Sequence, residues 1–277
     1  MNRLHKVRVA TVGDNCIDRY VGGGGDRVAV AAGNAVNVAV HLARMGFDVD
    51  YYGAVGRDED GDTMLATLAA LGVGVGHVRR LSWPTSVTEV TLDPGGERIF
   101  SAFAPGAAEA YRPTDEEVAG LAAYAFVHVT ALPDLPGQLA AIVAHAGSVS
   151  CDFSDDEPPE PCTGLALAVV SVAEEASDDA AVGVARRLVA DGAALGLVHR
   201  GAVGSVGVEG RRIVQVAAPS VKAVDTCGAG DASIAYLLAE RHGDADVETA
   251  MCRATEAAAR TCGHLGAWPQ EWLTTGD

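Results

Sequence analysis

Seven consecutive residues near the C-terminal end of the chain have the types and spacing to bind an anion and accept a proton. They read Asp225-Thr226-Cys227-Gly228-Ala229-Gly230-Asp231 and lead directly into an apolar run, Ala232 to Ala239. The small residues predict a turn into a helix. The first N–H groups of that helix lack partners inside it and lie at the positive end of its dipole, so they can hold a phosphate. Asp231 stands beside that position, where a carboxylate suits a general base toward a substrate hydroxyl; for Asp231 alone, a helix cap is the alternative.

A second group of polar residues follows the first expected strand. Val7 to Val12 is a β-branched run that ends at Gly13, and Asp14-Asn15-Cys16-Ile17-Asp18 comes directly after it. Because ligands bind beyond the carboxyl ends of strands in open α/β sheets, the polar members of this string are candidates for substrate contacts. An ordinary turn rich in Asp and Asn is the alternative interpretation.

The elements that must position these residues alternate along the chain. Strands are predicted over 7–12, 51–55, 126–129, 149–153, 166–172 and 196–199, and helices over 35–45, 62–71, 135–146, 178–192 and 247–262, with another from Ala232. This alternation predicts a parallel sheet with helices on both faces. Hairpins are predicted over 85–104, with a turn at 93–96, and over 205–216. Residues 22–26 are expected to form a glycine-rich link and residues 56–61 a charged turn without a chemical role.

Composition narrows the function classes. The chain has 277 residues, enough for one large α/β domain, and a formal charge of −17 that argues against a nucleic-acid partner. Its six cysteines lack CxxC spacing, which fits neither a zinc site nor a disulfide framework. The N-terminal residues lack the apolar core of a signal peptide, and no run approaches the ~20 apolar residues of a membrane span. These features predict a cytoplasmic protein with reduced thiols and no membrane partner.

The stretch from Asp225 to Asp231 resembles the D-T-x-G-A-G-D pattern of the PfkB (ribokinase-like) carbohydrate kinases, and the resemblance extends from Gly13 to Trp268. It implies an α/β, ribokinase-like three-layer fold with a central, mostly parallel sheet, helices on both faces and a small β lid. The resemblance further implies one kinase domain over residues 1–277, with the lid formed by segments near 14–32 and 85–105. Such lids often pair two subunits, so a homodimer through the lid is expected.

The resemblance also implies a role for each site residue. Asp231 is the expected catalytic base, and the amides of Gly228, Ala229 and Gly230 form the expected anion hole. The residues expected to face the sugar are Asp14, Asn15, Asp18, Gly33, Asn34 and Asn37. Those expected to bind the nucleotide, ATP, are Ser171, Glu174, His199, Arg200, Gly201 and Gly204. Glu174 is expected to organise Mg²⁺ through water, and Asp225, Cys227 and Gly266 resemble a monovalent-cation site that would hold K⁺.

Four positions depart from the family pattern. Ala32 stands where the family has the first of two glycines, and Ser171 stands where Asn is usual. His199 replaces a Thr that normally touches phosphate, and Arg200 beside it is unusual. Arg200 either contacts the ATP phosphates or points to solvent; the sequence leaves both open.

Four strings resemble the fructoselysine 6-kinase branch of the family. They are residues 12–18, 33–40, 152–155 and 264–268. This likeness implies transfer of the γ-phosphoryl group of ATP to O6 of fructoselysine or a related fructosamine. Asp152 or Asp155 could meet a cationic amino group of such a substrate, although a turn or helix-cap role is the alternative. Another ketose, aldose or nucleoside kinase remains an alternative, as does a catalytically weak sugar-binding protein.

Overall fold

A computed structural model describes residues 7–21, 27–92, 98–155, 158, 161–270 and 273–274, which fold around a nine-stranded sheet of order β13-β12-β11-β10-β9-β8-β1-β4-β5. The strands from β11 to β5 in this order pair in parallel. The β12–β13 hairpin adds two antiparallel strands at one edge. The strands of this sheet are β1 (Arg8–Val12), β4 (Asp48–Val55), β5 (Val73–Arg80), β8 (Phe126–Val129), β9 (Val149–Asp152), β10 (Leu165–Ser171), β11 (Leu195–His199), β12 (Gly204–Glu209) and β13 (Arg212–Ala217).

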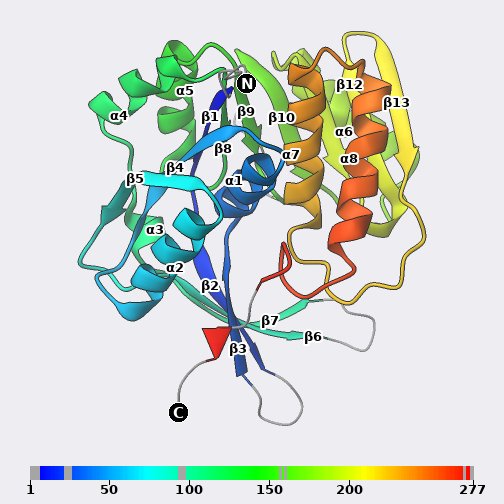
Figure 1. Ribbon diagram of the computed structural model, residues 1–277. Coiled ribbons are helices and arrows are strands. Elements are labelled where there is room, and N and C mark those ends of the chain that lie inside the picture. Colours follow the sequence, from blue (N-terminus) through cyan, green and yellow to red (C-terminus); the bar gives the residue numbers. More distant parts are fainter. Residues whose placement is uncertain are drawn as a thin grey trace, which may run out of the picture.

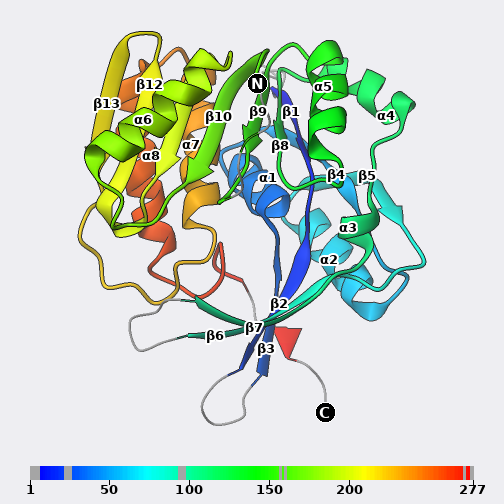
Figure 2. The ribbon, with the colours of Figure 1, turned by 180° about the vertical axis from the view of Figure 1, so that it is seen from behind.

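Helices cover both faces of this sheet. One face carries α1 (Asn34–Arg44), α2 (Glu59–Ala70), α7 (Ala229–His242) and α8 (Val247–Thr261), as Figure 1 shows. The other face carries α4 (Asp115–Gly120), α5 (Leu135–His145) and α6 (Asp178–Ala190), seen from behind in Figure 2. Short helical turns occur at α3 (Ala107–Ala110), η1 (Leu121–Ala123) and η2 (Gly201–Val203). The three-layer α/β fold expected from the sequence is confirmed.

The two helix layers bury two hydrophobic cores because successive strand residues point to opposite faces. Val9 joins the core under α1 and α7, whereas its neighbour Ala10 joins the core under α5 and α6. Val169 and Ala168 of β10 divide in the same way. Strands buried on both sides read as continuous apolar runs, which is why the sequence pattern already indicated a parallel sheet.

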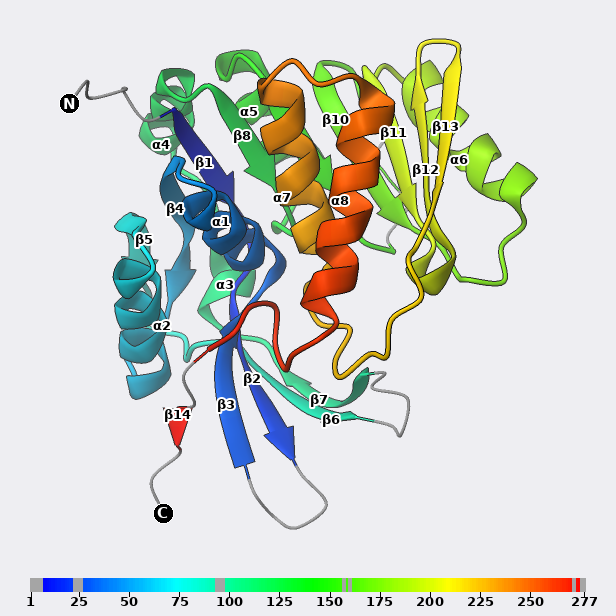
Figure 3. The same ribbon diagram turned by 45° about the vertical axis from the view of Figure 1, so that its right-hand side comes forward.

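A second, five-stranded sheet of order β14-β3-β2-β6-β7 lies beyond the end of the central sheet at which β1 leads into β2 (Figure 3). Its strands are β2 (Cys16–Val21), β3 (Arg27–Ala32), β6 (Val87–Leu92), β7 (Arg98–Ala104) and β14 (Leu273–Thr274). The hairpin expected over 85–104 is confirmed as the antiparallel pair β6–β7. The expected link at 22–26 and the turn at 93–96 lie outside the described residues. Strand β7 is an edge strand on which Ile99 and Phe103 are each more than half exposed.

Two local predictions need correction. The turn expected over 56–61 ends early, because Asp58 caps α2 by accepting a hydrogen bond from the Gly61 amide and the helix begins at Glu59. Strand β5, immediately after α2, was not predicted, because its glycines and exposed positions hide the pattern of a strand. Asp58 also accepts from the Thr85 amide and hydroxyl, at 2.7 and 2.6 Å. These bonds tie the end of β4 to the segment that leads into β6.

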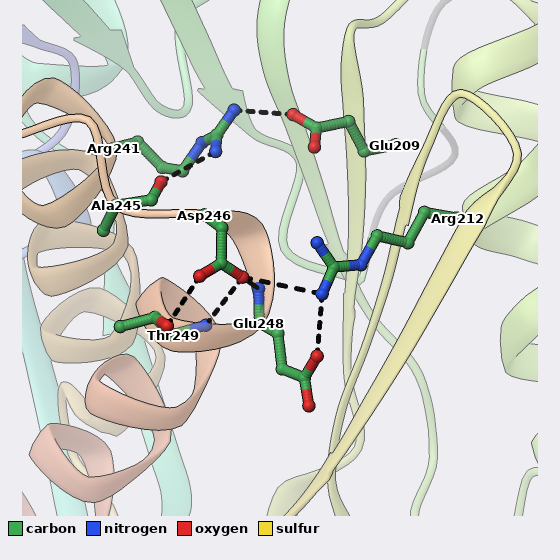
Figure 4. Close-up of polar contacts among 7 residues, drawn as sticks. All are labelled: Glu209, Arg212, Arg241, Ala245, Asp246, Glu248 and Thr249. Carbon is green, nitrogen blue, oxygen red and sulfur yellow. Dashed lines mark hydrogen bonds and ion pairs between the residues drawn. The ribbon is translucent and has the colours of Figure 1, made fainter.

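An ion-pair network anchors the β12–β13 hairpin to the turn between α7 and α8 (Figure 4). Arg212 lies 3.5 Å from Asp246 and 2.7 Å from Glu248, and Arg241 donates to Glu209 at 2.6 Å. These pairs are largely exposed, so each contributes about 1 kcal/mol or less. The network lies at the C-terminal end of α7, opposite the turn that contains Gly228 and Gly230.

Candidate active site

The turn over residues 225–230, which we call the anion turn because the sequence predicts that it binds an anion, is held in its shape by close packing. Gly228 adopts a left-handed conformation, φ 69°, immediately before α7. A β-carbon on Gly228 would lie 2.2 Å from the β-carbon of Ala267, so only glycine fits there. Helix α7 then begins at Ala229, whose amide donates to the Thr226 carbonyl at 3.3 Å, and Ala229 and Gly230 line the pocket described below.

Asp231 lies in the first turn of α7 and is 6% exposed. Its Oδ2 atom accepts a hydrogen bond of 2.7 Å from the Nδ2 atom of Asn37. Asn37 comes from the first turn of α1 and is 3% exposed. Two segments separated by 194 residues therefore meet at the expected base, and Asn37 fixes the orientation of its carboxylate.

The first residue of the anion stretch, Asp225, is fully buried and accepts three hydrogen bonds. Its Oδ1 atom accepts from the Cys227 amide at 2.9 Å. Its Oδ2 atom accepts from the Tyr20 hydroxyl at 2.6 Å and from the Gly266 amide at 2.8 Å. Tyr20 belongs to β2, so the small sheet is bonded directly to the anion turn. Among the described residues, no cluster of three His, Cys, Asp or Glu side chains forms a metal-binding group.

Asp14 joins strand β1 to the start of α1. Its Oδ2 atom accepts from the Asn34 amide at 2.9 Å, and its Oδ1 atom accepts from the Thr130 hydroxyl at 2.6 Å. Asp14 and the start of α1 stabilise each other, because a carboxylate interacts favourably with the positive end of the helix dipole. Gly33 permits this approach: a β-carbon there would lie 2.4 Å from the α-carbon of Asn15.

The structure separates two residues that were expected to face the sugar together. Asn15 is 2% exposed, and its Nδ2 atom donates to the Tyr51 hydroxyl at 2.8 Å and to the Ala54 carbonyl at 2.7 Å. Its amide therefore supports the end of β4 in this structure, and the expected contact of Asn15 with the sugar stays a prediction. Asp18 is 1% exposed and lies against the anion turn, because the Cys227 thiol is 3.8 Å from its Oδ2 atom.

The carboxyl end of β9 lies beside Asn34. The Asn34 side chain donates to the Ser154 hydroxyl at 3.1 Å, and the Ser154 amide donates to Asp152 at 2.9 Å. Burial, reinforced by the Asp14 and Asp155 carboxylates, raises the pKa of Asp152 to about 6. The Ser154 amide opposes this shift in pKa only in part.

Glu109, at the start of the short helix α3, belongs to the same surroundings. Partial burial and the nearby Asp14 carboxylate raise the pKa of Glu109. Asp14, Glu109, Asp152 and Asp155 therefore crowd the carboxyl ends of β1 and β9. None of these four acids forms an ion pair within the residues that the structure describes.

A pocket of about 560 Å³ opens beside the anion turn. Of the residues expected to bind the nucleotide, the structure places five in its wall: Ser171, Glu174, His199, Gly201 and Gly204. Ala229 and Gly230 contribute the anion turn to the same wall. The loop over 218–223 and α8 also line the pocket, mainly with small and apolar groups such as Pro219 and Val221.

Glu174 holds the loop at one side of this pocket. Its Oε1 atom accepts from the Ala202 amide at 2.6 Å, and a β-carbon on Gly201 would lie 2.1 Å from that oxygen. The side chain is exposed to the pocket, where a carboxylate can hold water molecules around a hard cation.

Arg200 is placed differently from both alternatives that the sequence left open. It is 7% exposed, so it does not point to solvent. Its Nη1 atom donates to Asp178 at 2.5 Å and its Nη2 atom to the Ala176 carbonyl at 2.5 Å. Both groups lie near the start of α6, and Arg200 is absent from the wall of the pocket. In this structure Arg200 therefore connects the 200–204 loop to α6, and its expected contact with the nucleotide stays a prediction.

Sequence reasoning missed several residues that the fold brings to the site. Tyr20 and Ser233 lie inside an unremarkable strand and an unremarkable helix, so no local pattern marks them. Glu109 reaches the acids at the carboxyl ends of β1 and β9 from the separate short helix α3. The sequence contains one indication that the 218–223 loop belongs to the site, which is its position just before residues 225–231.

Comparison with known proteins agrees with this geometry. Residues 19–272 match the family model described as pfkB family carbohydrate kinase. The chain is 32% identical to "Fructoselysine 6-kinase" of Shigella flexneri over 94% of this chain and 99% of that protein. It is 33% identical to "Fructokinase" of Klebsiella pneumoniae over 93% and 92%. The ribokinase of Arabidopsis thaliana, solved with ribose and ATP, has a TM-score of 0.81 at 21% identity, covering 94% of each chain.

The chain therefore belongs to the pfkB family of carbohydrate kinases. It is a phosphotransferase that uses ATP to phosphorylate a hydroxyl group of a small-molecule sugar. Among the described residues, no helix has the length and apolar character to cross a membrane.

Proposed function

We propose that this kinase phosphorylates the O6 hydroxyl of a fructosamine such as fructoselysine. The observation that supports this substrate is the group of acids at the carboxyl ends of β1 and β9, which we call the acidic edge: Asp14, Glu109, Asp152 and Asp155. A fructosamine carries a protonated amine, which a plain sugar lacks. A group of acids that forms no ion pair and includes the buried Asp152 favours such a ligand. The similarity to fructoselysine 6-kinase over nearly the whole chain supports the same substrate.

Within this proposal, Asp152 contacts the substrate amine. Its folded pKa of about 6 means that it is largely ionised at pH 7, and a bound cation would lower that pKa further. Asp18, in β2, accepts hydrogen bonds from the sugar hydroxyls, and Asn34, at the start of α1, donates hydrogen bonds to them. Asp14 acts mainly by fixing the start of α1.

Asp231 is the proposed general base. As the O6 atom attacks the γ-phosphorus of ATP in line, the bond from that phosphorus to ADP breaks and ADP leaves. The O6 proton passes to the Asp231 carboxylate, which Asn37 holds in place. The amides of Gly228, Ala229 and Gly230 stabilise the charge on the transferring phosphoryl group. Such preorganised donors typically contribute ~2.7–4 kcal/mol each.

The pocket beside Gly230 is the proposed nucleotide site. Glu174 would hold Mg²⁺ through water, and the ion would neutralise charge on the phosphates. The donor set at this position fits that assignment because the Glu174 carboxylate faces the pocket. Ser171, Gly201 and Gly204 complete the wall on this side.

The expected K⁺ site has a weaker basis. Three hydrogen bonds engage both oxygens of Asp225 and join the anion turn to Tyr20 and Gly266. A bound K⁺ would have to share those oxygens with Tyr20, Cys227 and Gly266. We therefore expect turnover without added K⁺, which replacement of all potassium salts by tetramethylammonium salts would test.

The organisation of the whole protein also remains a proposal. We infer that residues 1–277 form one kinase domain in which the small sheet serves as the lid. The exposed Ile99 and Phe103 on the edge strand β7 support pairing of two lids in a homodimer. Cytoplasmic location and the absence of nucleic-acid or membrane partners stay predictions.

A coupled assay of ADP release across a panel of acceptors tests the substrate. The panel contains fructoselysine, fructose, ribose and adenosine, each at several concentrations. Fructoselysine should give the highest kcat/KM, and Asp152→Asn should lower that value while it leaves kcat/KM for fructose within about twofold. A higher kcat/KM for fructose in the unmodified enzyme would show that it is a fructokinase. Binding of these sugars without ADP release would show a sugar-binding protein without turnover.

A further inference from the structure

Ser154 has an unusual backbone conformation two residues beyond the end of strand β9. Its φ angle is 54°, in the left-handed region that residues other than glycine rarely adopt. Among the described residues other than glycine, only Asp134 and Asp244 share this feature. Such a conformation is strained, and it persists only where the surrounding contacts require it. The contacts of Ser154 therefore show what the strain is used for.

Three element ends meet at Ser154 through its three polar groups. Its amide donates to the Oδ1 atom of Asp152, the last residue of β9, at 2.9 Å. Its carbonyl accepts from the amide of Ser171, the last residue of β10, at 2.6 Å. Its hydroxyl accepts from the Nδ2 atom of Asn34, the first residue of α1, at 3.1 Å. These three bonds hold the left-handed backbone in place.

The three partners of Ser154 belong to both halves of the proposed reaction centre. Asn34 and Asp152 are the proposed contacts of a sugar hydroxyl and of the substrate amine, and Ser171 lines the proposed nucleotide pocket. The conformation of Ser154 thus sets how the acceptor contacts stand relative to that pocket. In-line transfer requires a narrow range of distance and angle between the two substrates, so such a junction affects the rate as well as binding.

We propose that Ser154 is a positioning residue that joins the acceptor contacts Asn34 and Asp152 to the nucleotide pocket at Ser171. The inference rests on the proposed roles of those three residues. The hydroxyl of Ser154 orients the Asn34 amide group, and its backbone orients the Asp152 carboxylate and the end of β10. Ser154 acts through these residues and needs no contact of its own with either substrate.

Two variants separate the hydroxyl from the backbone. Ser154→Gly removes the hydroxyl but adopts the left-handed conformation readily, so the bonds to Asp152 and Ser171 can stay. Ser154→Ala removes the same hydroxyl and keeps the strain, so the backbone can relax away from both partners. Asp244→Ala is the matched control: Asp244 has φ 63° in the exposed turn between α7 and α8, at the end of α7 opposite the anion turn.

Steady-state kinetics with fructoselysine and with fructose is the primary readout. In Ser154→Gly, we expect the KM of each acceptor to rise about fivefold, the effect of an Asn34 donor that has lost its partner, while kcat stays within about threefold. In Ser154→Ala, kcat should fall at least about fivefold below that of Ser154→Gly, because misplaced groups react more slowly. In Asp244→Ala, KM and kcat should stay within about twofold of the unmodified enzyme.

Two results would overturn the inference. If KM and kcat of both Ser154 variants stay within about twofold of the unmodified enzyme, Ser154 serves stability alone. If kcat is equal in Ser154→Ala and Ser154→Gly, the left-handed backbone positions nothing. Should Ser154→Ala fail to fold, an unchanged acceptor KM in Ser154→Gly overturns the inference by itself.

The same comparison stays separate from the choice of substrate. The ratio of KM between Ser154→Gly and the unmodified enzyme is taken for each acceptor in turn, so a preference for fructose would refute the fructosamine proposal and leave this test intact. Acceptor Kd values from titration calorimetry give the same ratio without turnover. A ratio near one for both acceptors, with fructoselysine still preferred, would refute only the role of the Ser154 hydroxyl and with it the inference.

Discussion

Replacement of Asp231 by Asn should abolish most phosphoryl transfer and leave the fold nearly intact. The side chain is 6% exposed, and its Oδ2 atom accepts the 2.7 Å bond from Asn37. The Asn carboxamide has the same shape, and its oxygen can accept the same bond, so the free energy of unfolding should change by about 1 kcal/mol or less. An amide cannot take the proton of the sugar hydroxyl, and loss of a general base typically lowers the rate by ~10²–10⁴.

The measurements are kcat from the coupled ADP assay at saturating substrates, sugar binding by calorimetry, and urea unfolding followed by circular dichroism. Asn37→Ala serves as the matched variant, because it keeps the base but removes the donor that orients it. We expect kcat to fall about tenfold in Asn37→Ala, the effect of one lost hydrogen bond to a charged group. Turnover by Asp231→Asn within tenfold of the unmodified enzyme would refute the assigned base. An equal loss in both variants, with normal unfolding, would show that orientation matters more than proton transfer.

Three further predictions follow from buried polar contacts. Tyr20→Phe removes the hydroxyl that donates to Asp225, so the free energy of unfolding, measured by thermal denaturation, should fall by ~1.5–3 kcal/mol, and kcat should also fall. An unchanged free energy of unfolding and an unchanged kcat would mean that this hydrogen bond is not needed. Arg200→Leu should lower stability through the loss of its bond to Asp178, while the KM for ATP stays within about twofold; a larger rise in KM would restore a nucleotide role for Arg200. Burial lowers the pKa of His128 to about 3, so the free energy of unfolding should fall as pH decreases from 6.5 toward 3. His128→Gln should weaken this pH dependence, measured by urea unfolding at several pH values. An equal pH dependence in the variant and the unmodified protein would exclude His128 as the cause.

The exposed edge of the small sheet connects the proposed lid to the assembly of the protein. Strand β7 pairs only with β6 among the described strands, and it presents Ile99 and Phe103 to the outside. An exposed apolar edge favours pairing with another chain. The bond between Tyr20 and Asp225 would transmit the position of such a lid to the anion turn, because it joins β2 to the residue that orders the turn.

The sequence by itself determined the fold class and predicted the centre of the site. Apolar runs alternating with amphipathic segments indicated the parallel sheet and most of its helices, because local periodicity reports which faces are buried. The stretch from Asp225 to Asp231 indicated the anion turn, since its glycines are required by contacts as close as that between Gly228 and Ala267. Strand β5 escaped prediction because its glycines and exposed positions remove the periodic signal.

Only the tertiary structure decided which polar side chains work together. Asn15 and Asn37 looked alike in the sequence, yet one supports Tyr51 in the interior and the other orients Asp231. Arg200 looked like a phosphate ligand or a surface residue, yet it lies buried against the start of α6. Partners of this kind are separated by tens to hundreds of residues. Their choice depends on the direction in which each side chain leaves its strand or helix, and only the packing of the whole chain fixes that direction.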